Sequence, residues 1–442
     1  MPRIAFIGGG SLTWIPRFAH DLLREPRLAG STMVLMDTDP AALELMGRYS
    51  RALIAKRGGQ MGVETTTDRD EALQGADFVC STFMAGGHLA WAKDLNFAYS
   101  YGIRHPKGMS VGPGGLIQGL KAVPQLLDLA HAMECICPQA TLFNFTNPMS
   151  SISLALQRHS HVKTVGVCHG LLIGLDVFAR LMGCRRDDLI ARGAGVNHLD
   201  WVVSVRDKHT GQELLPEIAE RMRRLPRLSS PDEISDERVL QSSYEQYRLF
   251  GALPVPGDLH VTEFWPYFLR PGIDLWETLQ LRHNFVERRI EGKERYREAI
   301  LAGLSGAAPL PEPRGESLEE LENMIASMIY NEQRIYQLNV INNGAIENVM
   351  PGVCVESPVM IDQYGFHPVH FGSLPPAIAG WINLLGTVQD LTVRAAVEGS
   401  RQYALQALLL DPMCYHMEIS NVERMLDDLL AANREWLPAF FR

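Results

Sequence analysis

The sequence predicts an α/β protein: a Rossmann-like, doubly wound parallel sheet followed by a second, α+β domain. Short apolar runs alternate with segments of helical period over the first 195 residues, and a glycine-rich turn follows the first run. Such alternation is typical of a parallel sheet with helices on both faces. Beyond residue 195 the alternation stops. Since 442 residues exceed the size at which single cores stop growing, we expect two domains, 1–195 and 196–442.

Composition excludes several classes of protein. With 46% hydrophobic and 21% charged residues, the chain is ordinary for a globular protein. A net charge of -10 without a dense basic stripe disfavours a nucleic-acid partner. The first residues lack a signal-peptide layout, and no uncharged apolar run is long enough to span a bilayer. Seven scattered cysteines fit a reducing compartment, so we expect a cytoplasmic protein without a membrane partner.

The first half consists of predicted strand–helix pairs. Apolar runs predict strands within residues 3–8, 31–37, 63–67, 77–83, 140–146 and 161–168. Helical periodicity, and prolines suited to a first turn, predict helices from about residue 15, over 38–56, over 116–134 and after residue 148.

The second half has a different organisation. Residues 195–207 predict a strand in a different sheet, and residues 210–250 predict charged helices. A Pro/Gly-rich stretch at 304–317 predicts an exposed loop. Helical patterns cover 318–334 and the segment from 376 to the end. If the protein forms a homodimer or homotetramer, the apolar C-terminal helices are the candidate interface.

The turn after the first strand carries a dinucleotide-binding pattern. Gly8 and Gly10, followed by Ser11, match the start of G-x-G-x-x-G, with Thr13 in place of the third glycine. Such glycines let the backbone approach a pyrophosphate at a helix N-terminus. Asp37 ends the second apolar run, where a carboxylate can bind ribose hydroxyls and repel the 2′-phosphate of NADP. The pattern predicts NAD, with a nucleotide-free tight turn as the alternative.

An Asn-Pro pair follows the fifth predicted strand, in NFTNPMS (144–150). This is similar to the lactate and malate dehydrogenase branch of the fold, in which an asparagine near the nicotinamide presents polar groups to cofactor and substrate. We therefore expect Asn147 to contact the substrate. Capping of the helix that follows Pro148 is an alternative role, compatible with the first.

A cysteine and a histidine follow the sixth predicted strand. Cys168 and His169 stand at the carboxyl edge, where doubly wound folds bind ligands, and His198 follows Cys168 by about thirty residues. One thiolate and one imidazole are too few for a structural zinc site, which takes four protein ligands. They would suit a catalytic metal that also binds substrate and water. Spacing alone equally allows a buried cysteine beside a satisfied histidine.

Several motifs taken together resemble glycoside hydrolase family 4. In order they are IAFIGGGS, LMD, GPGG, NFTNP, VGVCHG, GVNHLDW, GDLHVTEFWPYF and INNGAIENVMPGVCVESP, and they extend over nearly the whole chain. Members of that family are α-glycosidases that depend on NAD and a divalent metal, usually Mn²⁺. The resemblance implies oxidation of the sugar at C3 by NAD, removal of the C2 proton, elimination of the aglycone, and return of the hydride.

The resemblance also implies roles for individual residues. Cys168 and His198 would bind the Mn²⁺ ion, and His169 would act as general acid or contact the substrate hydroxyls. Asp258, in GDLHVTEF, would be the C2 base, with a turn acid beside a glycine as the alternative. His260 and Asn343 would contact the substrate, together with Asn147.

Gly170 is the expected specificity position. Family members with glutamate after Cys-His tend to be α-glucosidases and those with serine α-galactosidases, whereas glycine resembles the branch that acts on α-linked uronic acids. A glutamate there would repel a C6 carboxylate. We expect an α-galacturonidase or α-glucuronidase, with Arg104, His105 and Lys107 as candidate partners of the carboxylate. If Gly170 merely permits the helix turn, the substrate would be a neutral α-galactoside or α-glucoside.

Two other classes compete with this interpretation. A 2-hydroxyacid dehydrogenase of the malate or lactate type needs an arginine clamp and an Asp–His relay, and neither motif is found at the expected place. A non-enzymatic NAD-binding protein would explain the Rossmann-like half. It would give no reason for the joint presence of Cys168, His169 and His198.

Overall fold

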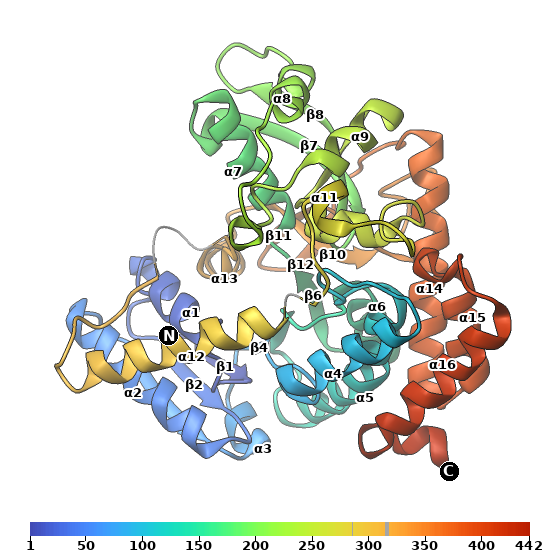
Figure 1. Ribbon diagram of the computed structural model, residues 1–442. Helices are drawn as coiled ribbons and strands as arrows, with labels where there is room; N and C mark the ends of the chain where they lie inside the picture. Colours follow the sequence, from blue (N-terminus) through green and yellow to red (C-terminus); the bar gives the residue numbers. More distant parts are fainter. Residues whose placement is uncertain (285, 314–317) are drawn as a thin grey trace.

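One continuous sheet runs through the protein (Figure 1). The computed structural model describes residues 1–284, 286–313 and 318–442. The strands are β1 (Arg3–Ile7), β2 (Thr32–Met36), β3 (Gly62–Thr66), β4 (Phe78–Ser81), β5 (Thr141–Asn144), β6 (Lys163–Val167), β7 (Leu189–Val196), β8 (Leu199–Asp207), β9 (Leu253–Val255), β10 (Arg334–Ile341), β11 (Cys354–Asp362) and β12 (Gly365–Pro368). They lie in the order β3-β2-β1-β4-β5-β6-β10-β11-β7-β8-β9, and β12 pairs with β11.

The first six strands are parallel, in the order 3-2-1-4-5-6 that is typical of dinucleotide-binding sheets. The helices of this half are α1 (Ile15–Leu22), α2 (Pro40–Lys56), α3 (Arg69–Leu73), α4 (Gly87–Ser100), α5 (Gly112–Ile136), α6 (Met149–His159) and α7 (Gly170–Met182). The predicted Rossmann-like fold is thus confirmed. Helix α4 was not predicted, and α5 begins four residues earlier than the pattern suggested.

The second half extends the same sheet with antiparallel strands. β10 pairs antiparallel with β6, and β11, β7 and β8 follow, so the expectation that residues 195–207 lie in a different sheet is wrong. The physical reason is that β10 covers the otherwise open edge of β6. The helices of this half are α8 (Leu215–Arg223), α9 (Gln241–Phe250), α10 (Asp258–Val261), α11 (Leu275–Leu279), α12 (Val286–Leu304), α13 (Leu321–Tyr330), α14 (Pro376–Glu398), α15 (Arg401–Leu410) and α16 (Ile419–Ala432).

Elements of the second half also pack against the first. Helix α12 crosses in front of the parallel strands and contacts α2 and α4, and α13 contacts α1 (Figure 1). The loop predicted at 304–317 follows α12, and its last four residues, 314–317, lie outside the described residues. The predicted domains 1–195 and 196–442 therefore share one sheet. None of the helices within the described ranges has the length and apolar character needed to cross a membrane.

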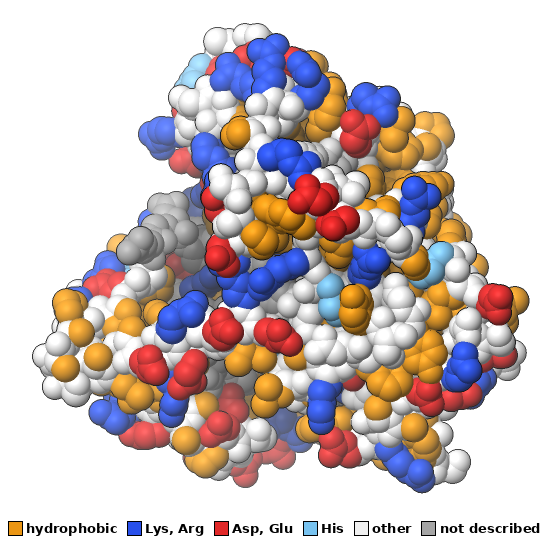
Figure 2. Space-filling model, in the orientation of Figure 1, with side chains coloured by type: hydrophobic (Ala, Val, Ile, Leu, Met, Phe, Trp, Pro, Cys, Tyr) orange, Lys and Arg blue, Asp and Glu red, His pale blue; other side chains and the backbone are white. Residues whose placement is uncertain are grey.

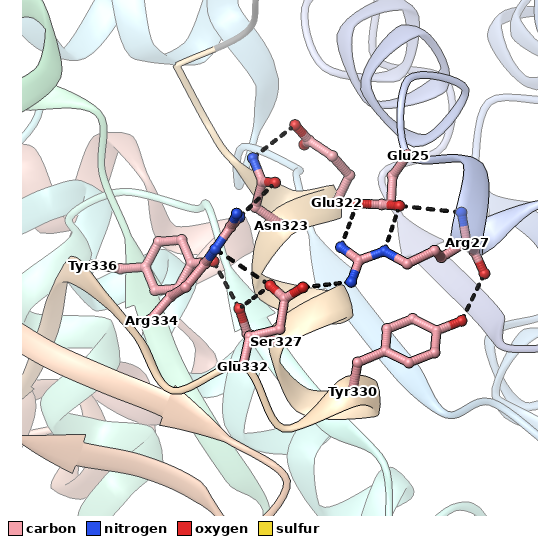
Figure 3. A network of polar contacts seen from close by, with 9 residues as sticks. All are labelled: Glu25, Arg27, Glu322, Asn323, Ser327, Tyr330, Glu332, Arg334 and Tyr336. Carbon is pink, nitrogen blue, oxygen red and sulfur yellow. Dashed lines mark hydrogen bonds and ion pairs between the residues drawn. The ribbon is translucent and has the colours of Figure 1, made fainter. Parts of the chain in front are cut away.

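A polar network fixes α13 against the first half (Figure 3). Arg27, in the turn after α1, pairs with Glu25 at 2.7 Å and with Glu332, and Glu332 in turn lies 3.3 Å from Arg334. The Tyr330 hydroxyl donates to the carbonyl oxygen of Arg27 at 2.8 Å. These contacts join the C-terminal end of α13, and the residues that follow it, to the first half of the chain.

A buried ion pair ties the C-terminal segment to α4 and α5. Lys121 Nζ lies 2.6 Å from Asp94 Oδ2 and 3.3 Å from Asn433 Oδ1. The Asn433 side-chain amide also donates to Asp94 Oδ1 at 2.8 Å. Both charged side chains are almost wholly buried. Each charge is therefore compensated by the other and by hydrogen bonds, which offsets the cost of removing it from water.

We predict that Lys121→Met destabilises the protein, because it leaves the Asp94 carboxylate buried without its cation. The free energy of unfolding should fall by about 3–5 kcal/mol, as measured by chemical denaturation. The double variant Lys121→Met, Asp94→Leu should recover most of this loss, since no unpaired charge then remains. A loss below about 1 kcal/mol in the single variant would contradict the prediction, because that is the size expected of an exposed pair.

Candidate active site

A cleft of about 1470 Å³ opens at the carboxyl ends of the parallel strands. This is the edge at which open α/β sheets bind ligands. Residues that follow β1, β2, β5 and β6 line it, together with side chains from the second half. The lining includes Gly8, Gly10, Ser11, Arg17, Asp37, Asn147, Cys168, His169, Gly170, Lys107, His198, Asp236, His260, Arg289 and Lys293. The structure thus brings most of the predicted site residues together.

The glycine-rich turn lies at one end of the cleft. Gly8 has a φ of +103°, and a Cβ there would lie 2.7 Å from Thr82 Oγ1, so only glycine fits. The Gly10 amide donates to Asp37 Oδ2 at 2.8 Å, which orients the carboxylate toward the turn. Ser11 follows in the same turn and also lines the cleft. These residues form a cradle of the kind that holds a dinucleotide.

Asn147 lines the cleft just before α6. Its side-chain oxygen accepts a hydrogen bond from the Met149 amide at 3.3 Å. This bond to the first residue of α6 is compatible with the predicted capping role, and Asn147 still lines the cleft.

Cys168 follows β6, and the Gly170 amide donates to its Sγ at 3.3 Å. Burial, together with the negative charge of Glu356, raises the pKa of the Cys168 thiol well above its ordinary value. A thiol in such surroundings loses its proton only beside a cation, so it would become a thiolate ligand when a metal ion binds.

His198 forms part of the two-residue turn between β7 and β8, with a φ of +68°. Its Nδ1 lies 2.8 Å from Ser110 Oγ, and its ring lies 4.3 Å from that of His260. Burial, assisted by the charge of Lys107, lowers the pKa of His198 to about 3. The imidazole is therefore neutral at pH 7, which is the form that binds metals.

The donor set fits a metal that keeps positions for substrate. Within the described ranges, no group of three or more His, Cys, Asp or Glu side chains is arranged to hold a metal ion. Cys168 and His198 would therefore supply two ligands, and substrate and water would have to complete the coordination. That arrangement is typical of a catalytic and not of a structural metal.

His169 belongs to an ion-paired chain that the sequence did not reveal. Its Nδ1 lies 2.6 Å from Glu319 Oε1, and Arg17 lies 3.7 Å from the same oxygen. Burial alone would lower the pKa of His169, but the charge and hydrogen bond of Glu319 raise it above its ordinary value. The imidazolium, a proton donor, is thereby favoured. No local pattern could have indicated Glu319, which lies 150 residues further along the chain.

The structure does not bring Asp258 to the cleft. The side chain is fully buried. Its carboxylate accepts hydrogen bonds from the Ser242 amide at 2.6 Å, the Ser243 amide at 2.8 Å and the Ser243 hydroxyl at 2.7 Å. Both serines lie in the first turn of α9. The predicted role of Asp258 as C2 base is therefore corrected: its oxygens stabilise a helix N-terminus and have no access to a substrate.

Asp236, in the loop before α9, brings a carboxylate to the part of the cleft near His260 and His198. Its Oδ2 lies 2.9 Å from Lys107 Nζ, and its Oδ1 lies 3.5 Å from His260 Nε2. Oδ1 is buried and has no hydrogen-bond partner among the described residues. The sequence did not single out Asp236, because it stands in an acidic stretch, residues 232–237, that looks like an ordinary solvated surface.

Of the three cations proposed as carboxylate partners, only Lys107 lines the cleft. The Arg104 guanidinium donates to the carbonyl oxygen of Ile273. His105 is buried, with Nδ1 3.5 Å from Glu263 Oε1. The same Glu263 oxygen accepts from the Lys107 amide at 2.7 Å. The first two candidates are therefore structural, and Glu263 positions the Lys107 backbone.

Asn343 also lies outside the cleft lining. It is exposed in the turn after β10, whereas the neighbouring Asn342 is buried. Asn342 donates to the carbonyl oxygens of Ile346 at 3.0 Å and Val349 at 2.8 Å. The predicted substrate contact of Asn343 is corrected accordingly: the NNG segment forms a turn held by Asn342.

Fold and cleft together define a class, a Rossmann-type enzyme in which the glycine-rich turn and the Cys168–His198 pair line one cleft. Comparison with known proteins identifies the family. The model of the family 4 glycosyl hydrolases matches residues 3–182, and that of the family's C-terminal domain matches residues 193–414. The chain belongs to the family 4 glycosyl hydrolases and is a glycoside hydrolase.

Relatives with different substrates align over almost the whole chain. The α-galactosidase of Bacillus subtilis (strain 168) is 30% identical over 447 residues, covering 100% of both chains. The α-galacturonidase of the same organism is 27% identical and covers 97% of this chain and 96% of its own.

Two solved structures support the fold. A 6-phospho-α-glucosidase from gut microorganisms, in complex with NAD and Mn²⁺, has a TM-score of 0.87 at 22% identity, covering 99% of each chain. Malate dehydrogenase of Plasmodium falciparum has a TM-score of 0.50 at 15% identity, covering 92% of this chain and 100% of its own. The predicted relation to the malate dehydrogenase fold is confirmed.

We predict that Asp258 contributes to the pH dependence of stability. Burial raises its pKa to about 6 from 3.8. Such a group contributes its full stabilisation below pH 3.8 and loses it as the pH rises from there through 6, by up to about 3 kcal/mol in all and by roughly 1 kcal/mol between pH 5 and 7. Chemical denaturation at pH 5, 6 and 7 should therefore show a smaller decline in Asp258→Asn than in the wild type.

The matched control for this prediction is Asp207→Asn. The Thr210 and His209 amides keep the pKa of Asp207 below its ordinary value, so this carboxyl group does not titrate between pH 5 and 7. An identical decline in the wild type and Asp258→Asn would mean that Asp258 has a normal pKa.

Proposed function

We propose that this protein is an NAD- and Mn²⁺-dependent α-glycosidase that acts on an α-linked uronic acid, an α-galacturonide or α-glucuronide. The observation that carries the proposal is that a single cleft contains both the glycine-rich turn after β1 and the Cys168–His198 pair. The related 6-phospho-α-glucosidase, which was solved with NAD and Mn²⁺, supports the choice of cofactors.

The residues present fit both cofactors. The amides of the Gly8–Ser11 turn and the Asp37 carboxylate would hold the dinucleotide, and Cys168 and His198 would hold the metal. When bound, NAD supplies a hydride acceptor for the sugar C3 and Mn²⁺ supplies a Lewis acid for the oxygen on that carbon. An acid at position 37 favours NAD over NADP, since it would repel a 2′-phosphate.

Two side chains are placed to move protons. Asp236 Oδ1 is buried in the cleft without a hydrogen-bond partner in the described part of the chain, so it is available to remove the proton from the sugar C2. His169 is held through Nδ1 by Glu319, which leaves Nε2 as the atom that donates a proton to the leaving oxygen. Lys107 Nζ pairs with the other carboxylate oxygen, Asp236 Oδ2, and so orients the side chain.

Gly170 supports the uronide preference. A Cβ at this position would meet only ordinary contacts, 3.5 Å from Cys168 Sγ and 3.7 Å from Pro256 Cδ. At Gly174, in the same helix, a Cβ would lie 2.4 Å from Val255 Cγ1, so that glycine is required by packing. Since packing does not require glycine at 170, we ascribe the glycine to substrate specificity. A glutamate at this position would repel the carboxylate of a uronate, and glycine does not.

A neutral α-galactoside is the second candidate substrate. The Bacillus subtilis α-galactosidase is 30% identical to this chain, compared with 27% for the α-galacturonidase of that organism. We also propose a cytoplasmic location, because all seven cysteines are free and Cys168 must remain a thiol to bind a metal. The homodimer or homotetramer expected from the apolar C-terminal helices stays a prediction.

Release of p-nitrophenol from its α-galacturonide, α-glucuronide and α-galactoside tests the function. Each reaction is run with and without NAD and Mn²⁺, under thiol. We expect a uronide to be cleaved fastest, and cleavage to stop when either cofactor is omitted. Cleavage of the galactoside alone would keep the mechanism and remove the uronide preference. NADH formation from simple 2-hydroxyacids, without any glycoside cleavage, would contradict the proposal.

We predict that Asp236→Asn lowers kcat by roughly 10²–10⁴-fold, the usual contribution of a general base. The Kd of NAD should stay unchanged, because Asp236 lies at the sugar end and not at the dinucleotide turn. Asp258→Asn is the matched control, since it makes the same chemical change outside the cleft. Its kcat, measured well below its melting temperature, should remain within about threefold of the wild type. A large loss of kcat in Asp258→Asn, with little change in Asp236→Asn, would mean that Asp258 is the base.

A further inference from the structure

Helix α12 presents two cations to the cleft. Arg289 and Lys293 both line it, and a separation of four residues places them on one face of the helix. Ile300, further along the helix, is fully buried in the core of the first half. That end of α12 is therefore anchored, and the end that carries the two cations lies over the cleft.

Arg289 lies over the indole ring of Trp91, with its Cζ 5.8 Å from the ring centre. The Trp91 Nε1 donates a hydrogen bond to the carbonyl oxygen of Gly108 at 3.0 Å. Gly108 follows Lys107, whose Nζ lies 2.9 Å from Asp236 Oδ2. These contacts place the guanidinium on the side of the cleft that Lys107 and Asp236 line.

Lys293 lies one turn further along the helix, with Nζ 3.0 Å from His88 Nε2. Burial, together with the charges of Lys293 and Arg289, lowers the pKa of His88 to about 3, so this imidazole accepts a hydrogen bond from the ammonium. Burial lowers the pKa of Lys293 to about 8, which still leaves it charged at pH 7. Two positive charges therefore face the cleft from adjacent turns.

These two cations lack the counter-charge that the others have. Arg17 lies 3.7 Å from Glu319, and Lys107 lies 2.9 Å from Asp236. Over residues 1–284, 286–313 and 318–442, no carboxylate lies within ion-pair distance of Arg289 or Lys293. Figure 2 shows several Lys and Arg side chains near the middle of the view, next to the place that α12 occupies in Figure 1. Neighbouring like charges repel each other, so an anion bound between them would be stabilised.

We propose that Arg289, supported by Lys293, binds the carboxylate of the uronic acid substrate. This rests on the proposed uronide preference and names the residues that produce it. A guanidinium offers two parallel N–H donors that match the two oxygens of a carboxylate. The dinucleotide phosphates have a separate place at the Gly8–Ser11 turn. Glycine at 170 completes the arrangement, because a glutamate in this cleft would compete for the guanidinium.

The test compares substrates that differ only in the carboxylate. Wild type, Arg289→Met, Arg289→Lys and Lys293→Met are assayed with p-nitrophenyl α-galacturonide, α-glucuronide and α-galactoside at saturating NAD and Mn²⁺. Losing a charged hydrogen-bonding partner should raise KM of Arg289→Met for the better uronide by roughly 10- to 100-fold. KM for the galactoside should stay within about threefold. Arg289→Lys should recover part of the loss, and Lys293→Met should show a smaller change in the same direction.

Arg295→Met is the matched control. It removes the same charge from the same helix, at an exposed position that does not line the cleft. Its kinetics with all substrates should equal those of the wild type. The Kd of NAD, measured by tryptophan fluorescence, should be the same in every variant.

The outcomes separate the two proposals. If wild type cleaves a uronide but Arg289→Met loses the same factor with uronide and galactoside, Arg289 does not recognise the carboxylate and the inference is wrong. A rise in the Kd of NAD in Arg289→Met or Lys293→Met would show that the anion is a cofactor phosphate, which also overturns it. If the wild type cleaves only the galactoside, the proposed uronide preference is wrong, and the inference about Arg289 is wrong with it. This outcome is seen in the wild type alone and needs no variant.

Discussion

The active site depends on the alignment of six parallel strands, whose carboxyl ends all reach one edge of the sheet. The backbone ladder from β3 to β6 sets this alignment. Gly8, Asp37, Asn147 and Cys168 are far apart in the chain, but each follows a strand of this ladder and lines the same cleft. No side-chain contact between them is needed. The main-chain hydrogen bonds of the ladder therefore set the relative positions of the strand ends that carry these residues.

The same sheet places the residues of the second half. β10 pairs with β6, and β11 and β7 continue from it, so His198 is tied to Cys168 through paired strands. Glu356 on β11 reinforces the connection, since it accepts a hydrogen bond at 3.1 Å from Asn339 on β10 and another at 3.1 Å from Asn197, next to His198. A metal held by one ligand from each half would thus bind to a single continuous framework.

Residues at strand ends could be predicted from the sequence, and those that reach the site across the fold could not. Gly8, Asp37 and Cys168 could be predicted because each of them follows or ends an apolar run that predicts a strand. Asp236 and Glu319 have no such signal, because they approach the cleft only through long-range packing. The error at Asp258 has the same origin. The sequence shows an acid after a glycine, but the N-terminus of α9, which captures its carboxylate, is brought there by the tertiary fold.

The distribution of charge along the cleft explains why net charge says little about the substrate. Asp37, Asp39, Asp68 and Asp70 line the cleft just after β2 and β3, where Asp128 pairs with Arg69, whereas Lys107, Arg289 and Lys293 line it from the loop before α5 and from α12. Ribose hydroxyls are hydrogen-bond donors and suit the first group, and a sugar carboxylate suits the second. A protein with a net charge of -10 can therefore favour an anionic sugar, since charges lining a cleft are screened less than those on the open surface. The local field at the bond to be cleaved, and not the total charge, determines which glycoside is recognised.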